Sequence, residues 1–407
     1  MDFYIYFGLL FFITVIALCS FKIGNCCIDG VLTNISVLLF AIFSIYIFYT
    51  SVNAIDSVNY ETKFEYINTL SVSVDYLFTA FIKFVKKFTD DYQIFRGIIG
   101  CIYLVPIFLI LKREKKSDFN IPLFLMLCLI FPFFQNIVAL RYTMASAIAV
   151  SAMYLYLKSN QSRKAAAGVV VAILVSSMIH DVTIIYLIIF ALFLLYKRIS
   201  DKTIMTFSLM GLDVVLIILL RTDVLSGLLN SLIGDTNTFY LGIMESAGIG
   251  FVISIFLHVC FVLLIQTAIQ RNNNGENNID ESDYLAKSID EDIMLLNYCS
   301  FILIPMYAVN VLSFRLFRGM LVLDFLEVSK CYNEKNKDIA LFEIIILEVI
   351  CMLFDANGIE SIISVIGGVI ACRIVCVFRR QKSGSYISKQ KRKALCDHPL
   401  LWEVSAA

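Results

Sequence analysis

An arginine and a histidine stand at the ends of two neighbouring apolar segments. Arg141 begins the segment that runs to residue 157, and His180 ends the segment that starts at residue 165. A charged or titratable group beside membrane hydrocarbon is costly, so it is a functional-site hypothesis by default. A guanidinium binds phosphate oxygens through paired hydrogen bonds, and an imidazole exchanges a proton near neutral pH. Together the two side chains could bind a phosphorylated group and move a proton.

Composition places these side chains in a polytopic membrane protein. Of 407 residues, 59% are hydrophobic and 16% are charged, whereas a soluble domain has roughly 25% charged residues. We therefore expect an all-α fold built from membrane-spanning helices. No basic domain exists outside the loops and the C-terminal tail, so nothing in the composition indicates nucleic-acid binding.

The apolar runs predict about thirteen transmembrane helices, within a range of about twelve to fourteen, because a helix needs roughly 20 apolar residues to cross the hydrocarbon core. The weakest run is 316–330, which Arg318, Asp324 and Glu327 interrupt. The predicted spans cover 3–20, 31–50, 94–111, 119–138, 141–157, 165–180, 183–196, 203–220, 248–269, 293–312, 316–330, 338–354 and 359–377.

The basic loops orient the chain, because Lys and Arg collect on the cytoplasmic side of membrane proteins. The clusters KREKK at 112–116, KSNQSRK at 158–164 and KRISDK at 197–202 are two spans apart, so they share one face. With thirteen spans, the basic tail 379–407 lies on the same cytoplasmic face as these clusters, and the N-terminus lies on the outer face. Residues 1–378 then form a single polytopic transmembrane domain, with Arg141 and His180 at its outer face.

Three segments between the spans stand out. Residues 270–292 are acidic and Asn-rich, which indicates a cytoplasmic linker loop, and 222–247 form an outer loop. The outer loop 51–93 contains apolar residues at helical spacing with lysines on the other face, which predicts an amphipathic helix along the outer membrane surface; simple packing is an equal alternative. The apolar positions are Val74, Leu77, Phe78, Phe81, Val85 and Phe88, and the lysines are Lys83, Lys86 and Lys87.

Further arginines lie at the predicted outer ends of the spans. Arg221 ends the eighth span, and Arg315 and Arg318 follow the tenth. A single interfacial arginine is more often a snorkelling anchor than a ligand, but several on one face with a histidine suit a diphosphate group. Arginines can neutralise the charge on a departing diphosphate, so we expect neither a metal nor another cofactor.

His180 completes this chemistry, because it could accept the proton of an attacking hydroxyl group. The phosphate-rich substrates of an outer membrane face include sugars linked to polyprenyl diphosphate. Asp181, which directly follows His180, could hold the imidazole in one tautomer. For His258, in the middle of a span, we expect a packing role.

Four stretches resemble the EpsG family of exopolysaccharide-synthesis membrane proteins, which are similar to Wzy-type polysaccharide polymerases. In the stretch that begins at Leu140, Tyr142 follows Arg141 where the family usually has Gln. In the same stretch, Asp181-Val182-Thr183 follows His180 where the family has x-Ser-Ala. The stretches are NAIDSVNYETKF at 53–64, SVDYLFTAFIKFVKKFTDDYQIF at 73–95, the span pair from Leu140 to Leu187, and SFRLFRGML at 313–321.

The resemblance implies a bacterial plasma-membrane enzyme that polymerises lipid-linked oligosaccharide repeat units for exopolysaccharide, capsule or O-antigen. Arg141, His180 and Arg315 would be catalytic. Asp181, Arg221 and Arg318 would help to bind substrate, and Asp56 and Tyr60 would contact sugar. The expected partners are polyprenyl-diphosphate-linked oligosaccharide, membrane lipids, a repeat-unit flippase and a chain-length regulator.

Other functions remain open on the sequence. A metal-dependent glycosyltransferase would use the acidic pair Asp90-Asp91 and would stop in the presence of a chelator. A transporter or flippase for lipid-linked glycans would need a polar path and broken helices in related halves. A ligase would add one glycan block, whereas a polymerase makes a ladder of lengths. A noncatalytic assembly scaffold would need none of the outer arginines.

Overall fold

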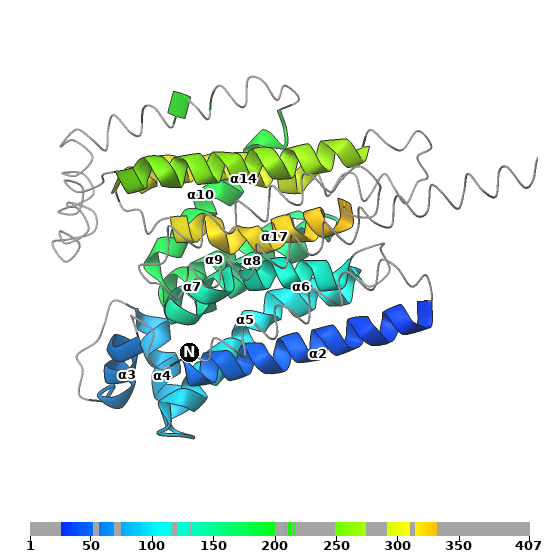
Figure 1. Cartoon of the computed structure of the whole chain (residues 1–407). Helices are drawn as coiled ribbons and strands as arrows, with labels where there is room; N and C mark the ends of the chain where they lie inside the picture. The colour runs from blue at the N-terminus through cyan, green and yellow to red at the C-terminus, as the bar shows by residue number, and fades with distance from the viewer. Residues whose placement is uncertain are drawn as a thin grey trace, which may run out of the picture.

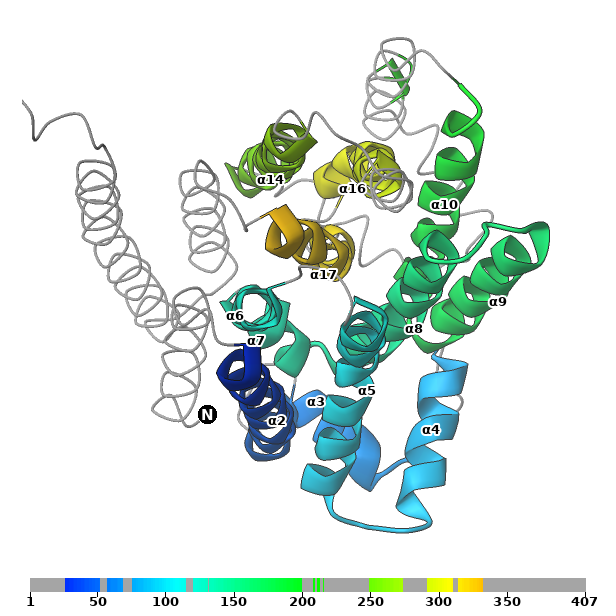
Figure 2. The ribbon, with the colours of Figure 1, turned by 90° about the vertical axis from the view of Figure 1, so that its right-hand side faces the viewer.

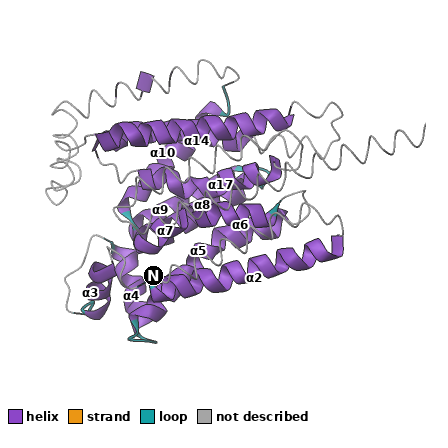
Figure 3. Ribbon diagram, in the orientation of Figure 1, coloured by secondary structure: helices purple, strands orange, loops and turns teal. Residues whose placement is uncertain are grey.

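A computed structural model describes residues 26–51, 57–68, 75–114, 120–130, 132–199, 208, 211–212, 215, 249–273, 291–309 and 314–331. Every regular element within these ranges is a helix, so the expectation of an all-α fold is confirmed there (Figure 3). The elements are α2 (Cys26–Thr50), α3 (Ser57–Glu65), α4 (Tyr76–Lys86), α5 (Tyr92–Glu114), α6 (Ile121–Ile130), α7 (Pro132–Val138), α8 (Leu140–Leu157), α9 (Arg163–Ile179), the 3-10 helix η1 (Asp181–Ile184), α10 (Ile185–Tyr196), α14 (Ile249–Asn273), a helix over 291–299, the 3-10 helix η4 (Ser300–Leu303), α16 (Ile304–Val309) and α17 (Phe314–Cys331).

The long helices run side by side along one axis, and two short helices cross that axis at one end. α2, α14 and α17 extend along the bundle, while α3 and α4 lie together at the end where α2 finishes (Figure 1). The view along the axis shows α17 at the centre, surrounded by α14, α16, α8, α5 and α6 (Figure 2). The strongest packing joins α8 to α9, α2 to α5, α5 to α8 and α14 to α17.

The surface of this bundle is apolar along several helices. Among the described helices, α2 and α5 are long and apolar enough to cross a membrane, over Thr33–Thr50 and Tyr92–Glu114, and shorter apolar helices cover Asp181–Tyr196 and Ser254–Thr267. Large apolar side chains point outward along several helices, where contact with lipid would remove the cost of exposing them to water. They include Leu38 and Ile42 of α2, Val171 and Met178 of α9, Ile188 of α10, and Phe256 and Leu263 of α14.

Two predicted spans are interrupted. The span 119–138 consists of α6 and α7, with Pro132 as the first residue of α7, and the span 293–312 is divided among the helix over 291–299, η4 and α16, which contains Pro305. A proline lacks the backbone N–H and its ring clashes with the preceding turn, so a helix breaks or restarts there. Each of these two predicted spans therefore consists of more than one helix within the described residues.

Seven other predicted spans coincide with helices, and the rest of the sequence lies largely outside the described residues. The coinciding spans are 31–50, 94–111, 141–157, 165–180, 183–196, 248–269 and 316–330. The spans 3–20, 338–354 and 359–377, nearly all of 203–220, the loop 222–247, most of 270–292 and the tail 379–407 fall outside.

The charged residues that interrupt α17 are buried inside the bundle. Arg318, Asp324 and Glu327 have no exposed surface. Asn297 donates a hydrogen bond to Asp324 Oδ1 at 2.6 Å, and Lys330 lies 2.7 Å from Glu327. Polar groups within membrane helices face neighbouring helices rather than lipid, and the central position of α17 allows this on every side.

Ion pairs join the basic loops at the bundle end opposite α3 and α4. Lys158, which follows α8, forms an ion pair with Glu114 at the end of α5. Glu114 Oε2 also lies 3.9 Å from Lys330 Nζ. Lys197, after α10, pairs with Asp292 at 2.6 Å and also bonds Gln161 in the loop between α8 and α9. The basic clusters that start at residues 112, 158 and 197 therefore share one end of the bundle, as their spacing of two spans predicted.

The predicted amphipathic helix is α4, and it crosses the bundle axis (Figure 1). Phe78, Ile82 and Val85 are buried, while Lys83 and Phe88 are exposed. Phe88 follows the helix instead of continuing its buried face. Lys86, predicted on the lysine face of this helix, is partly buried, and its Nζ donates to the carbonyl oxygens of Phe64 and Glu65 at 3.0 and 2.6 Å. These hydrogen bonds join α4 to α3.

Candidate functional site

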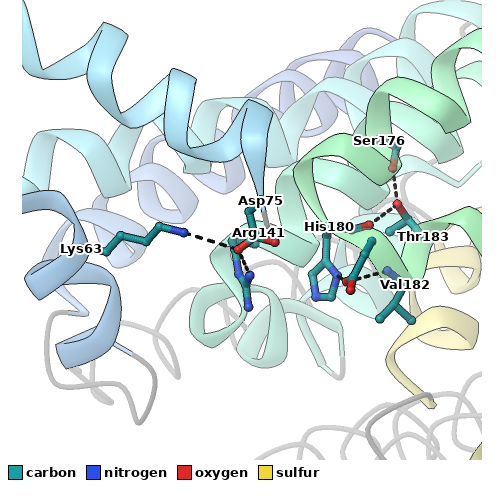
Figure 4. A network of polar contacts seen from close by, with 8 residues as sticks. Lys63, Asp75, Arg141, Ser176, His180, Val182 and Thr183 are labelled. Carbon is teal, nitrogen blue, oxygen red and sulfur yellow. Dashed lines mark hydrogen bonds and ion pairs between the residues drawn. The ribbon is translucent and has the colours of Figure 1, made fainter. Parts of the chain in front are cut away.

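The α8–α9 hairpin brings Arg141 and His180 to the same end of the bundle. The side chain of Ser162 accepts a hydrogen bond from Ala165 N at 3.2 Å and so begins α9. α8 and α9 pack along their lengths, so the first turn of α8 meets the last turn of α9. The side chains of Arg141 and His180 lie beside each other and point to the same side, below the N-terminal end of α4 (Figure 4).

Buried hydroxyl groups fix the turn that carries His180. The Thr183 hydroxyl donates to the His180 carbonyl oxygen at 2.7 Å, and Ser176 Oγ donates to Thr183 Oγ1 at 2.9 Å. Ser176 Oγ also lies 2.8 Å from the Ala145 carbonyl oxygen on α8. The Thr183 and Ser176 hydroxyl groups therefore hold the backbone of His180 and link it to α8, and neither contacts the imidazole (Figure 4).

Asp181 sets the tautomer of His180. Its Oδ1 accepts from Val182 N at 2.8 Å and lies 3.2 Å from His180 Nδ1. The hydrogen bond with His180 holds the pKa of Asp181 below its ordinary value, with a smaller contribution from Arg141. An ionised carboxylate only accepts hydrogen bonds, so Nδ1 carries the proton and Nε2 of the neutral ring keeps its lone pair. The ring can therefore accept a proton at Nε2.

Arg141 is held from the side of α3 and α4. Its Nη1 forms an ion pair with Asp75 Oδ2, and Lys63 Nζ lies 3.4 Å from the same oxygen (Figure 4). Tyr60 also interacts electrostatically with the guanidinium. The Nε of Arg141 is buried and has no hydrogen-bond partner among the described residues. The guanidinium thus keeps donor capacity beside the imidazole.

Tyr142 connects His180 to the start of α17. Its ring lies edge-on to the imidazole at a centroid distance of 6.1 Å, and Arg318 lies over the ring at 5.6 Å. Its hydroxyl is 2.9 Å from that of Tyr186, which donates to the Leu316 carbonyl oxygen at 2.7 Å. This chain of contacts joins α8, α9, α10 and the first turn of α17, so the arginines of α17 are fixed relative to His180.

The sequence-predicted arginines occupy different environments. Arg315, in the first turn of α17, is partly exposed, and its Nε is buried without a hydrogen-bond partner among the described residues. No hydrogen bond or ion pair joins Arg315 to Arg141 or His180 in the described part of the chain. Arg318 is fully buried behind Tyr142, so a substrate would reach it only after the tyrosine moved.

Tyr60 is the described residue among the two assigned to sugar binding and the remaining arginine, Arg221. Tyr60, on α3, lies close enough to interact with Arg141 and packs edge-on against Phe78 at 5.9 Å. Asp56 and Arg221 lie outside the described residues. Tyr60 therefore lies at the same end of the bundle as the Arg141 guanidinium.

Sequence reasoning missed Asp75, Lys63 and the tyrosine pair. Asp75 stands 66 positions before Arg141, and its only sequence signal is an acidic residue directly before an amphipathic helix. Lys63 lies on a short polar helix that periodicity alone does not distinguish from a loop. Tyr142 stands where the family usually has Gln, so the family pattern gave it no role, yet its ring contacts the imidazole.

Two other predictions concern side chains outside this site. Asp91 Oδ1 accepts from Gln93 N at 2.7 Å and so caps α5, which gives one carboxylate of the Asp90-Asp91 pair a structural task. His258 is fully buried, with Nε2 2.8 Å from Ser300 Oγ and Nδ1 2.8 Å from Tyr307 Oη. The predicted packing role of His258 is confirmed.

Comparison with known proteins agrees with the resemblance in the sequence. The sequence profile of the EpsG family matches residues 31–367, which is most of the chain. The match includes Arg141, His180, Arg315 and the helices that carry them. No curated protein and no solved structure matches the chain.

Proposed function

The chain belongs to the EpsG family of exopolysaccharide-synthesis membrane proteins, and we propose that it polymerises oligosaccharide repeat units linked to polyprenyl diphosphate. The observation that carries this proposal is the juxtaposition of Arg141 with the His180–Asp181 pair at one end of the bundle. A phosphate-binding cation can stabilise the departing diphosphate, and a base with an available Nε2 can take the acceptor proton, as glycosyl transfer from a lipid diphosphate would use them.

The proposed reaction is a single displacement. The oxygen of an acceptor hydroxyl attacks the anomeric carbon of the growing glycan, and a new glycosidic bond forms. The bond from that carbon to the diphosphate oxygen breaks, and its electron pair leaves with the polyprenyl diphosphate. His180 Nε2 takes the hydroxyl proton and later releases it to water. Asp181 stabilises the imidazolium in the transition state, because its carboxylate contacts Nδ1.

Arg141 and Arg315 would bind the diphosphate in this reaction. Each guanidinium has a buried Nε without a hydrogen-bond partner among the described residues, and a phosphate oxygen is a suitable acceptor. Neutralising the charge on the departing group lowers the barrier without protein movement. Tyr60 and Asp56 would contact sugar, Arg318 would hold Tyr142 against the imidazole, and Arg221 would add to the diphosphate site.

The proposed setting is the outer face of a bacterial plasma membrane. About thirteen spans, with the N-terminus outside, would put the basic ends around Lys158 and Lys197 in the cytoplasm. α3 and α4 would then lie at the outer surface, above Arg141 and His180. A repeat-unit flippase would supply the lipid-linked units there, and a chain-length regulator would limit the polymer.

The test is polymerisation by the purified protein supplied with lipid-linked repeat units. We expect Arg141→Ala and His180→Ala each to reduce the rate of ladder formation, by roughly 10²–10⁴-fold for the base. Arg163→Ala is the matched control, because Arg163 is exposed at the opposite end of the bundle. Stably inserted variants that polymerise at the normal rate would contradict the proposal. A product with a single added block would identify a ligase instead.

A further inference from the structure

The helix α4 buries one of its faces and exposes another that carries aromatic rings. Phe78, Ile82 and Val85 form the buried face. The Phe78 ring meets Tyr60 of α3 and Phe95 of α5 at centroid distances of 5.9 and 6.0 Å. The apolar side of the amphipathic pattern is therefore occupied by the bundle, so this side of α4 cannot lie against a membrane.

The exposed side of α4 combines aromatic rings with lysines. Tyr76, Phe84 and Phe88 are 61%, 57% and 76% exposed, and they form what we call the aromatic face. The rings of Phe84 and Phe88 meet edge-on at 5.2 Å. Lys83 and Lys87, which directly precede the two phenylalanines, are also exposed. Contact of such rings with water is unfavourable, and a group of them on a surface indicates an interaction site.

The position of α4 brings this face to the edge of the lipid-facing surface. α4 crosses the bundle axis at one end (Figure 1), and in the view along the axis it lies at the edge of the molecule, beyond α5 and next to α9 (Figure 2). α9 exposes an apolar stripe at helical spacing up to its last turn, formed by Val171, Leu174, Val175 and Met178. An apolar surface at membrane depth therefore extends to α4.

The exposed charges around the aromatic face cancel. Lys83 and Lys87 are followed by Asp90 and Asp91, which are exposed as well, whereas Lys86 donates to backbone carbonyl oxygens. An acidic protein partner would therefore gain little from long-range attraction. Lipid phosphates lie directly above hydrocarbon, so each lysine can reach a phosphate while the ring beside it enters the apolar layer.

We propose that the aromatic face of α4 lies on the membrane surface at this end of the bundle, which is the outer leaflet in the proposed setting, with Lys83 and Lys87 at the lipid phosphates. The inference rests on that setting and deepens the proposed function. Asp75, which directly precedes α4, forms an ion pair with Arg141. A docked α4 therefore holds the Arg141 end of the bundle at the level of the headgroups, where the diphosphate of a lipid-linked substrate lies.

The test is tryptophan fluorescence of the full chain in lipid nanodiscs. Trp402, the single tryptophan of the chain, is replaced by Phe, and Phe84→Trp or Phe88→Trp is then introduced. Bromine atoms near the ester groups of the lipids quench a shallow ring, and bromine atoms near the chain ends quench a deep one. An interfacial helix buries its apolar side only to about 5–10 Å, so both variants should lose more emission to the shallow bromines. Phe88→Trp serves if Phe84→Trp does not insert, since Phe88 follows the last residue of α4.

Two matched controls come from other helices. Leu263→Trp should lose more emission to the deep bromines, because Leu263 is exposed in the middle of the long apolar helix α14. Thr62→Trp should keep its emission, because Thr62 is exposed on the polar helix α3.

Unquenched emission from both Phe84→Trp and Phe88→Trp would overturn the inference. A red-shifted spectrum would then show that water covers the face, and a blue-shifted spectrum that another part of the chain or a second copy covers it. Quenching measures depth, whereas polymerisation measures chemistry, so the two proposals can fail separately. Shallow quenching together with normal polymerisation by Arg141→Ala would leave the inference standing and reject the proposed function. The opposite pair of results would reject only the inference.

Discussion

Arg96 and His258 in the interior differ from Arg141 and His180 at the proposed site in how much hydrogen-bonding capacity their side chains retain. Arg96 and His258 are fully buried. Arg96 donates from all three nitrogens, to Phe48 O at 2.8 Å, Ser57 Oγ at 3.3 Å, Tyr92 Oη at 3.4 Å and Ile137 O at 3.1 Å. His258 uses both ring nitrogens and stacks on Phe317 at 3.8 Å. Every side-chain nitrogen of Arg96 and His258 therefore already has a hydrogen-bond partner.

Arg141 and His180 have the opposite character. Arg141 retains a buried Nε without an acceptor in the described residues, and His180 engages a side-chain partner through Nδ1 only. The residue types are the same as in the interior pair, and both arginines belong to the bundle end that carries α3. Residue type and proximity to the membrane therefore do not define the site. What defines it is the hydrogen-bonding capacity that each side chain has not used within the protein.

Arg96 and Arg141 should therefore lose very different amounts of stability on the same substitution, and this is the largest effect that we expect. Arg96→Met removes the donor that joins the end of α2 to α3 and α7, and each buried acceptor left without its donor costs about 1–3 kcal/mol. Arg141→Met breaks a partly exposed ion-pair cluster and should cost about 1 kcal/mol or less. Thermal unfolding in detergent measures both. Equal losses of stability would remove the distinction between the two arginines.

Gly319 tests whether the tyrosine pair holds α17 against the site. A Cβ at Gly319 would overlap the hydroxyl groups of Tyr142 and Tyr186, whereas a Cβ at Gly168 of α9 would meet nothing within 4 Å. Gly319→Ala should cost about 1–3 kcal/mol through overpacking and lower the polymerisation rate, because Arg315 moves with α17. Gly168→Ala is the control and should do neither. Wild-type stability and rate in Gly319→Ala would show that this contact does not position α17.

Asp181 gives the smallest expected effect, which depends on pH. Its pKa is lowered in the folded protein, chiefly by the hydrogen bond with His180. The pair therefore stabilises the fold above the ordinary carboxyl pKa of about 3.9, and this contribution is lost as pH falls through the lower folded value. Asp181→Asn should flatten the acid side of a plot of melting temperature against pH.

The control for this pH series is Asp90→Asn, at an exposed carboxylate before α5, which should keep the wild-type acid slope. An Asp181→Asn profile parallel to the wild type down to acid pH would mean that the Asp181–His180 hydrogen bond contributes nothing to folding. The imidazole would then need another group to fix its tautomer.

Part of this arrangement could be predicted from the sequence because it is local. Consecutive apolar segments joined by a short basic loop form an antiparallel hairpin, so Arg141 and His180 had to lie at the same end. The helix at 76–86 followed from the spacing of Phe78, Leu77, Phe81 and Val85. The EpsG resemblance, carried by short motifs around these residues, is confirmed by the family match.

The rest depends on contacts between distant segments, which periodicity does not encode. Nothing in the sequence pairs Asp75 with Arg141 or Tyr186 with Leu316, since these contacts arise from the packing of α4 and α17 against the hairpin. The buried charges of α17 weakened its hydropathy signal for the same reason, because a central helix can bury Asp324 against Asn297. Pro132, by contrast, is a local sequence signal for the start of a new helix, α7, after α6. The prediction of one span over 119–138 missed this signal, because it used only the length of the apolar run.

The most direct test compares the two histidines in one assay, as polymer ladder formed per correctly inserted molecule in proteoliposomes with lipid-linked repeat units. His180→Gln should form ladder at a rate reduced by roughly 10²–10⁴-fold while inserting normally. His258→Gln should reduce the amount of inserted protein, and the molecules that insert should polymerise at the wild-type rate. A wild-type rate from His180→Gln would contradict the assignment of His180 as the base.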